Sequence, residues 1–119
     1  MTVSSDIAVQ EAELNQLILD GQALAAFETF YAEDVVMQEN SDPPTIGKAA
    51  NREREQALIG NLAAFKAELQ GSAIAADLSY SEWIYTFTFR DGQRRLLHEV
   101  SARRWRAGKV IHERFYFER

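Results

Sequence analysis

Residues Phe30–Asn40 read FYAEDVVMQEN, and within them a helical pattern gives way to an extended one. The run from Val35 to Met37 is too short and too rich in β-branched side chains to favour a helix. We predict a short strand over residues 33–39, followed by a turn-forming loop, NSDPPTIG, at 40–47. Glu39 ends this strand, either as a carboxylate in a pocket or only as the polar end of the strand.

The segments on either side of this stretch show helical spacing. Leu14 and Leu17 share one face of a first helix, which Gly21 can end, and Phe27 and Tyr31 belong to a shorter second helix. After the loop we predict the longest helix, over residues 48–70, from apolar residues that step by four and three: Leu58, Leu62, Phe65 and Leu69. Its NREREQ segment at 51–56 is expected to be a solvated face.

Beyond Gly71 the apolar period falls to two, which is typical of strands. The Asp91-Gly92 pair predicts a two-residue hairpin loop, and a three-residue turn at 106–108 leads into a last strand over 109–118. Helices followed by an antiparallel meander predict an α+β domain with the helices packed on one sheet face.

The hairpin arithmetic predicts which side chains share a sheet face. It places Trp83, Tyr85 and Phe87 opposite Val100, His98 and Leu96, on one face with His112. The other face is expected to hold Ile84, Thr86, Leu97, Glu99, Ser101, Arg103, Ile111, Glu113, Phe115 and Phe117. Both faces are apolar, so we expect one to meet the helices and the other to meet a second copy of the chain in a homodimer.

Composition limits the functions that fit. The 119 residues are enough for a single domain, 1–119, and the absence of cysteine excludes thiol nucleophiles and cysteine metal sites. A net charge of -5 gives no basic surface for nucleic acid, and no apolar run is long enough to span a membrane. The two histidines lack a third ligand at metal spacing. We expect a cytoplasmic protein without metal or cofactor that binds neither nucleic acid nor membrane.

Three motifs in this order resemble the NTF2-like superfamily, and within it the SnoaL-like branch. They are YAEDVVMQEN, the loop ending TIGKAANRE ahead of a helix, and the closing WRAGKVIHERFYFE. The resemblance covers nearly the whole chain. It implies an α+β cone in which a curved antiparallel sheet wraps around the N-terminal helices and leaves a pocket at the open end. Family members include polyketide cyclases, ketosteroid isomerases, epoxide hydrolases and binding domains, so the fold does not fix a reaction.

The ketosteroid isomerase branch implies roles for individual positions. Aligned from Tyr31, the isomerase base falls on Glu39, while its oxyanion tyrosine falls on Asn15 and its protonated aspartate near Ser101. The two strong donors to an oxyanion are therefore absent, and losing such a donor typically costs about 2.7 to 4 kcal/mol of transition-state stabilisation. Isomerisation by that mechanism is not expected, although Asn15 and Ser101 can still orient a ligand or a water.

Two further branches turn attention to acids on the later strands. The epoxide hydrolase branch uses two acids and an arginine, and Glu99, Arg103 and Glu113 match by residue type but not by spacing, so a structural salt bridge is the preferred interpretation. The SnoaL-like cyclases use an acidic residue as general acid-base. Glu39, Glu99 and Glu113 each have that chemistry if burial raises the carboxyl pKa.

These considerations give two hypotheses. The first is a cofactor-independent isomerase, cyclase or hydrolase that binds a small apolar, polyketide-like or terpenoid-like molecule and uses a glutamate for proton transfer or water activation. The second is a non-catalytic ligand-binding or dimerisation domain of the same fold. The candidate catalytic residues are Glu39, Glu99 and Glu113, and the candidate substrate-binding residues are Asn15, Tyr31, Met37, Ser101, Arg103, Phe115 and Phe117.

Overall fold

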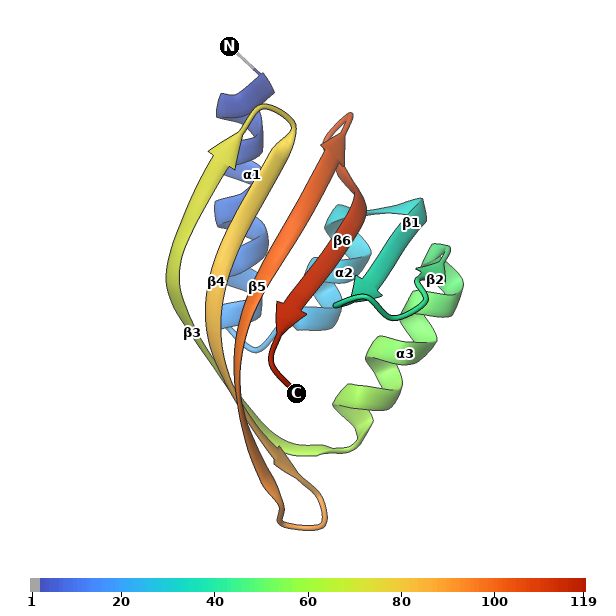
Figure 1. The fold of residues 1–119 in the computed structure, drawn as a ribbon, viewed down its shortest axis with the longest axis vertical. Coiled ribbons are helices and arrows are strands. Elements are labelled where there is room, and N and C mark those ends of the chain that lie inside the picture. The colour runs from blue at the N-terminus through green and yellow to red at the C-terminus, as the bar shows by residue number, and fades with distance from the viewer. Residues whose placement is uncertain (1–2) are drawn as a thin grey trace.

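The computed structural model describes residues 3–119 as three helices packed on one six-stranded sheet. The helices are α1 (Val3–Leu19), α2 (Ala23–Phe30) and α3 (Lys48–Gly60). The strands are β1 (Tyr31–Glu39), β2 (Thr45–Ile46), β3 (Leu62–Ala75), β4 (Leu78–Phe89), β5 (Arg94–Arg106) and β6 (Lys109–Phe117), in the order β2-β1-β6-β5-β4-β3. The long strands curve together, with α1 and α2 behind them and α3 beside β1 and β2 (Figure 1).

The predicted α+β class with a curved sheet around the helices is confirmed. Every neighbouring pair of strands is antiparallel except β1 and β6, which run parallel. The second helix stops at Phe30, and Tyr31 already begins β1, so the change from helix to strand falls two residues earlier than expected. No helix among residues 3–119 is long and apolar enough to cross a membrane.

The helix predicted over residues 48–70 is wrong in its second half. α3 ends at Gly60, and residues from Leu62 onward form β3, which pairs with β4 along almost its whole length. The segment LAAFKAELQ is rich in helix-forming residues, but the long ladder to β4 outweighs that weak local preference. The glycine at 60 was the stop signal, since it is a poor residue for a helix interior.

Both predicted hairpin loops differ from the observed ones by one residue in length. The β4-β5 loop has three residues, Arg90 to Gly92, closed by a bond from the Phe89 amide to the Gln93 carbonyl (2.8 Å), and Gly92 takes a φ of 88°. The β5-β6 loop has two residues, Ala107 and Gly108, both at positive φ, as a two-residue hairpin turn requires. A bulge after Arg104 then shifts the β5-β6 ladder further.

The corrected register changes both predicted faces, because it exchanges the β4 residues between them. Tyr85 pairs with Leu97 and Trp83 with Glu99, so the Trp83, Tyr85 and Phe87 stripe lies on the same face as Glu99. This inner face meets the helices and carries Leu97, Glu99, Ser101, Arg103, Glu113, Phe115 and Phe117. The outer face carries Ile84, Thr86, Leu96, His98, Val100, His112 and Tyr116. The two-residue turn places Val110 opposite Trp105, and both belong to the core, whereas the bulge skips Ile111 in the β5-β6 ladder and leaves it only half-buried.

Candidate functional site

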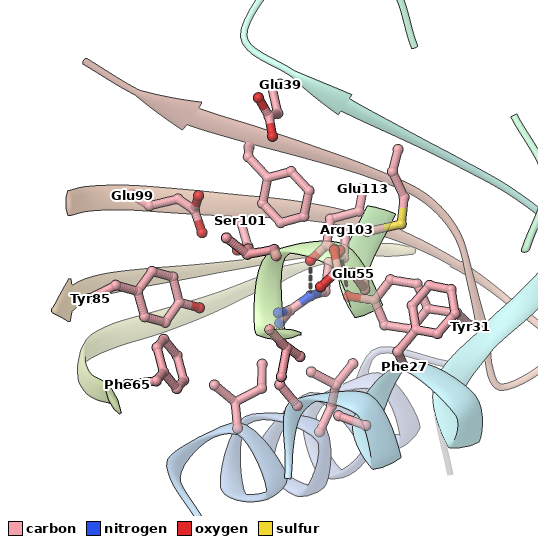
Figure 2. A pocket seen from close by; sticks show the side chains of 18 of the residues that line it. Phe27, Tyr31, Glu39, Glu55, Phe65, Tyr85, Glu99, Ser101, Arg103 and Glu113 are labelled. Carbon is pink, nitrogen blue, oxygen red and sulfur yellow. Dashed lines mark hydrogen bonds and ion pairs between the residues drawn. The ribbon is translucent and has the colours of Figure 1, made fainter. Parts of the chain in front are cut away.

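A cavity of about 390 Å³ lies between the inner face of the sheet and the helices. Its walls are mainly apolar, and four carboxyl groups and one guanidinium project into it from β1, α3, β5 and β6 (Figure 2). Its apolar and aromatic lining includes Leu14, Ile18, Ala26, Phe27, Tyr31, Met37, Leu58, Ile59, Phe65, Tyr85, Phe87 and Phe115, and its polar lining is Glu39, Glu55, Glu99, Ser101, Arg103 and Glu113.

Eight of the ten candidate site residues line this cavity. They are Tyr31, Met37, Glu39, Glu99, Ser101, Arg103, Glu113 and Phe115. Asn15 is buried behind the wall, where it bonds to Arg103, and Phe117 packs against the Trp83, Tyr85 and Leu97 cluster without lining the cavity. The roles predicted for these residues stay predictions, while their gathering around one space is a property of the fold.

Arg103 is the centre of a buried ionic network. Its Nε donates to Glu113 (2.6 Å) and its Nη1 donates to Glu11 and to Asn15 (2.9 Å each), and all of these side chains are almost fully buried. Tyr31 donates its hydroxyl hydrogen to the other oxygen of Glu113. The salt bridge expected among Glu99, Arg103 and Glu113 therefore joins Arg103 to Glu113, while Glu11 takes the place expected for Glu99.

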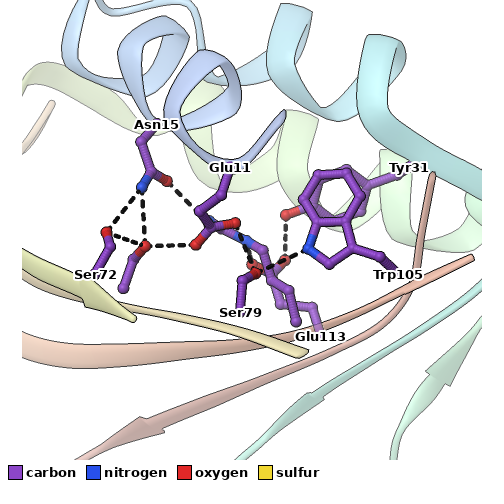
Figure 3. Close-up of polar contacts among 9 residues, drawn as sticks. Glu11, Asn15, Tyr31, Ser72, Ser79, Trp105 and Glu113 are labelled. Carbon is purple, nitrogen blue, oxygen red and sulfur yellow. Dashed lines mark hydrogen bonds and ion pairs between the residues drawn. The ribbon is translucent and has the colours of Figure 1, made fainter. Parts of the chain in front are cut away.

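The network continues from Glu11 to β4 through hydroxyl groups (Figure 3). Ser79 donates to Glu11 (2.8 Å), and Trp105 donates its indole hydrogen to Ser79 (2.8 Å). Ser81 also donates to Glu11. Asn15 completes this side by donating to Ser81 (2.8 Å). Glu11 thus accepts three hydrogen bonds, as a buried carboxylate requires. Sequence analysis missed it, although it follows Ile7 by four residues and precedes Leu14 by three, which places it on the apolar face of α1.

Glu99 differs from Glu113 because nothing holds it. It lies on β5, paired with Trp83 and Phe117 on the neighbouring strands, and is only 9% exposed. Among the described residues it has no hydrogen bond or ion pair, and its carboxyl group turns toward the cavity (Figure 2). Burial, together with the charge of Glu113 nearby, raises the Glu99 pKa to about 8.

Ser101 stands two residues along the same strand. Its side chain is fully buried and lines the cavity, and its hydroxyl has no partner among residues 3–119. Buried hydroxyls are normally hydrogen-bonded, so an unpartnered one facing a cavity is available to a ligand.

Glu55 is the cavity residue that sequence analysis misplaced. It belongs to the NREREQ segment that was expected to face solvent, yet it is half-buried and lines the cavity from α3, also without a hydrogen bond or ion pair within the described chain. Burial and the charge of Glu113 raise its pKa to about 7. The signal was its position four residues after the buried Asn51 and four before Ile59, on the inward face of α3.

Glu39, the last residue of β1, lies at the rim of the cavity. Its side chain is 38% exposed and forms ion pairs with Arg54 (3.0 Å) and Arg119 (3.4 Å). It is therefore solvated and held by charge on two sides, unlike Glu99 and Glu55.

An aromatic wall adjoins Glu99. Phe65 lies 5.3 Å from Tyr85 and 5.5 Å from Phe87 between ring centroids, and Tyr85 stacks on Trp83 at 5.4 Å. Burial and the charge of Glu99 raise the Tyr85 pKa well above its usual value, so its hydroxyl stays protonated. This wall was missed because the one-residue error in the first hairpin had assigned the stripe to the opposite face.

The polar groups of the cavity do not form a cluster of metal-ligand type. Among residues 3–119, no three His, Cys, Asp or Glu side chains gather as metal ligands. Asn15 and Ser101, the positions that match the oxyanion donors of the isomerase, differ in their surroundings. Asn15 is hydrogen-bonded behind the cavity wall, whereas the Ser101 hydroxyl faces the cavity and has no partner among the described residues.

Comparison with known proteins shows the family to which the chain belongs. No curated protein matches the chain in sequence. A crystal structure of a proposed SnoaL-like polyketide cyclase from Mesorhizobium loti is 25% identical, with a TM-score of 0.80, over 92% of this chain and 97% of that one. An NTF2-like protein of unknown function from Burkholderia pseudomallei is 12% identical, with a TM-score of 0.81, over 95% and 91% of the two chains.

A third structure, AclR, a proposed hydroxylase from Streptomyces galilaeus, is 15% identical with a TM-score of 0.80, over 97% of this chain and 90% of that one. The two structures below 25% identity share the fold. The family model for the SnoaL-like domain matches residues 13–113. This range includes every residue named above in the buried ionic network except Glu11. The protein therefore belongs to the SnoaL-like family of the NTF2-like superfamily.

Proposed function

We propose that the cavity binds a small, largely apolar molecule with a polyketide-like or terpenoid-like body, and that Glu99 exchanges a proton with it. The observation that carries this proposal is the state of Glu99: a buried carboxyl group, free of partners, with a pKa of about 8, facing an apolar cavity. Ligand sites typically combine apolar walls with a few convergent polar groups whose pKa values are perturbed.

The chemistry follows from that pKa. At neutral pH Glu99 is mostly protonated and serves as a general acid toward an oxygen or carbon of the bound molecule. After donating, its carboxylate serves as the base that takes a proton back, and such positioned proton transfer contributes about 10² to 10⁴ in rate. Ser101 orients the polar end of the ligand.

The other two predicted catalytic acids take different parts in this proposal. Glu113 is engaged by Arg103 and Tyr31, so it keeps the network charged and adds to the repulsion that raises the Glu99 pKa. Glu39 is tied to arginines at the rim and contacts the ligand at the mouth of the cavity. The name of the Mesorhizobium loti relative supports a cyclase, since closing a polyketide ring requires acid-base catalysis at carbonyl groups.

The test is exchange of the α-hydrogen of enolisable ketones and of a poly-β-carbonyl compound, followed by proton NMR in deuterium oxide. Glu99→Gln should lower the rate by about 100-fold or more while the compounds still bind. Glu82→Gln, at an exposed position on the neighbouring strand, is the matched control. Equal rates for Glu99→Gln and the unsubstituted protein would remove Glu99 from the mechanism.

A non-catalytic binding domain is the second candidate function. It is favoured by the extent to which Arg103, Glu113 and Asn15 bond to one another, which is how structural polar groups behave. Saturable binding of the same compounds, with no exchange above the buffer rate at any pH between 5 and 9, would establish this candidate instead.

We also propose that the chain forms a homodimer through the outer sheet face. Leu96 is 61% exposed there, Tyr116 45% and Tyr80 38%, and Ile84 and Val100 are half-buried between them. Glu82, His98 and Arg114 lie among them on this face. Several large exposed apolar side chains on one sheet face are typical of a protein-protein contact with a polar component.

A further inference from the structure

The ionisable side chains that line the cavity are biased toward acids. Among the described residues that line it, β1, α3, β5 and β6 each contribute a carboxyl group: Glu39, Glu55, Glu99 and Glu113. Arg103 is the one cationic side chain in that lining, and the lining residues of α1 and α2 are apolar. A carboxylate or phosphate ligand would therefore meet repulsion from those of the acids that are ionised.

The single guanidinium does not alter this bias. Arg103 already pairs with two carboxylates, Glu113 at 2.6 Å and Glu11 at 2.9 Å, so its positive charge is more than balanced within the wall. Its Nη1 also donates to the side-chain oxygen of Asn15 (2.9 Å), which lies behind the cavity wall, so this hydrogen bond too points away from the cavity.

The groups left free in the cavity can all accept a hydrogen bond. Glu99 and Glu55 have no hydrogen bond or ion pair within the described chain. Independently of these acids, the fully buried Ser101 hydroxyl has no partner and lines the same space. A ligand group that carries several N–H donors and a positive charge would satisfy all three.

The aromatic side chains complete an environment that suits a cation. Tyr85 and Phe87 form a wall with Phe65 beside Glu99, with ring centroids 5.3 to 5.9 Å apart. The negative face of an aromatic ring attracts a cation that lies against it, and more strongly when the cation is desolvated.

We propose that the natural ligand carries a protonated amine on an apolar body, with the ammonium group placed among Glu99, Glu55 and Ser101. This inference rests on the proposed binding function but not on the proposed proton transfer. It narrows the ligand class from apolar molecules in general to lipophilic amines.

Charge coupling then links ligand binding to proton release. In the empty cavity, burial and the charge of Glu113 raise the pKa of Glu99 to about 8 and that of Glu55 to about 7, with Arg103 opposing the shift at Glu99 and Arg54 opposing it at Glu55. An entering ammonium group favours the ionised carboxylates, so the protons leave. Glu99 then takes part in any reaction as a base.

The experiment compares three probes of matched shape by titration calorimetry: 2-phenylethylamine, 2-phenylethanol and 3-phenylpropanoate. At neutral pH the amine should bind at least tenfold more tightly than the alcohol, and the carboxylate should not bind. Repeating the amine titration in two buffers of different ionisation enthalpy should show release of about one proton per amine bound, and the amine affinity should rise by about tenfold per pH unit between pH 6 and 7.

Substitutions identify the groups responsible. Glu99→Gln and Glu55→Gln should each lower the amine affinity by about tenfold, reduce the proton release and leave the alcohol affinity unchanged. Glu82→Gln and Glu53→Gln, at exposed positions on β4 and α3, are the matched controls and should bind all probes as the unsubstituted protein does.

The outcomes separate the two proposals. If the alcohol or the carboxylate binds as tightly as the amine, or if the glutamine variants keep the amine preference, the amine inference is overturned while the binding function stands. If none of the three probes binds, both the binding function and the amine inference fail.

Discussion

Glu99 and Glu113 lie on neighbouring strands and face the same cavity, yet their surroundings give them opposite chemistry. Glu113 accepts hydrogen bonds from Arg103 and Tyr31, which hold its side chain in place. Glu99 has no such partner, so burial dominates and its pKa rises to about 8. The residue type alone does not distinguish the two, because the difference comes from the hydrogen-bond donors that the fold brings to each.

This difference predicts a pH dependence of stability. Glu99 ionises near its usual value of 4.5 in the unfolded chain and near 8 in the folded one, so the unfolded chain loses this proton first. The free energy of unfolding should therefore fall as the pH rises from about 4.5 to about 8 and level off above that. In Glu99→Gln the fall should be smaller, by on the order of a few kcal/mol, as urea unfolding at pH 5, 7 and 9 would measure. Glu55 acts in the same direction up to about pH 7, so some dependence remains in the variant. Parallel curves for the two proteins would contradict the raised pKa.

Part of this site could be predicted from the sequence, and the reason is physical. Glu99, Glu113 and Arg103 lie at alternating positions of predicted strands, and a register error of two residues leaves their faces unchanged. Glu55 belongs to a run of charged residues, for which the sequence predicts a solvated face, and the packing of α3 turns it inward together with Asn51. Tyr85 was not predicted to face the cavity, because the error in the first hairpin is a single residue. An error of one residue exchanges the two faces of the sheet for the β4 side chains.

At the scale of elements, α1 is joined to the sheet by charge as well as by apolar packing. Glu11 reaches from α1 to Arg103 on β5 and to Ser79 and Ser81 on β4. Removing one partner of a buried ion pair leaves the other uncompensated, at a typical expense of about 3 to 5 kcal/mol.

We therefore expect Glu11→Ala to destabilise the protein by about 3 kcal/mol or more, measured by chemical unfolding at neutral pH. The control is Glu13→Ala, on the exposed side of the same helix, which should change stability by about 0.5 kcal/mol or less. Similar effects for the two variants would show that the apolar contacts of α1 hold it without help from the network.

The elements themselves were predictable where pattern and propensity agree. The β4 and β5 strands, with their alternating residues and glycine turn, were found from sequence, and so was the helical N-terminal segment. β3 was not, because residues 62–70 combine helix-forming residue types with spacing that fits a helix. Their extended form depends on pairing with β4, a contact between segments that local patterns do not encode.

For the whole molecule, the outer sheet face predicts the assembly. We expect sedimentation or light scattering at micromolar concentration to give twice the chain mass of 13.5 kDa. Leu96→Lys should shift the protein toward monomer because it places a charge where the most exposed apolar side chain of the proposed contact lies. Val9→Lys, at an exposed position on α1, is the control and should leave the mass unchanged. A mass of 13.5 kDa for the unsubstituted protein would rule out this dimer at that concentration.

The parallel pairing of β1 with β6 also constrains the order in which the molecule can form during synthesis. β1 is made before the other five strands of the described chain, but apart from the two-residue β2 its neighbour in the sheet is β6, which is made after those five. Such distant pairing slows folding, because a long loop must close before the contact contributes. The rim acid Glu39 and the cavity residues on β6 thus come together only after β6 has been made, and until then β1 lacks the parallel neighbour that it has in the folded sheet.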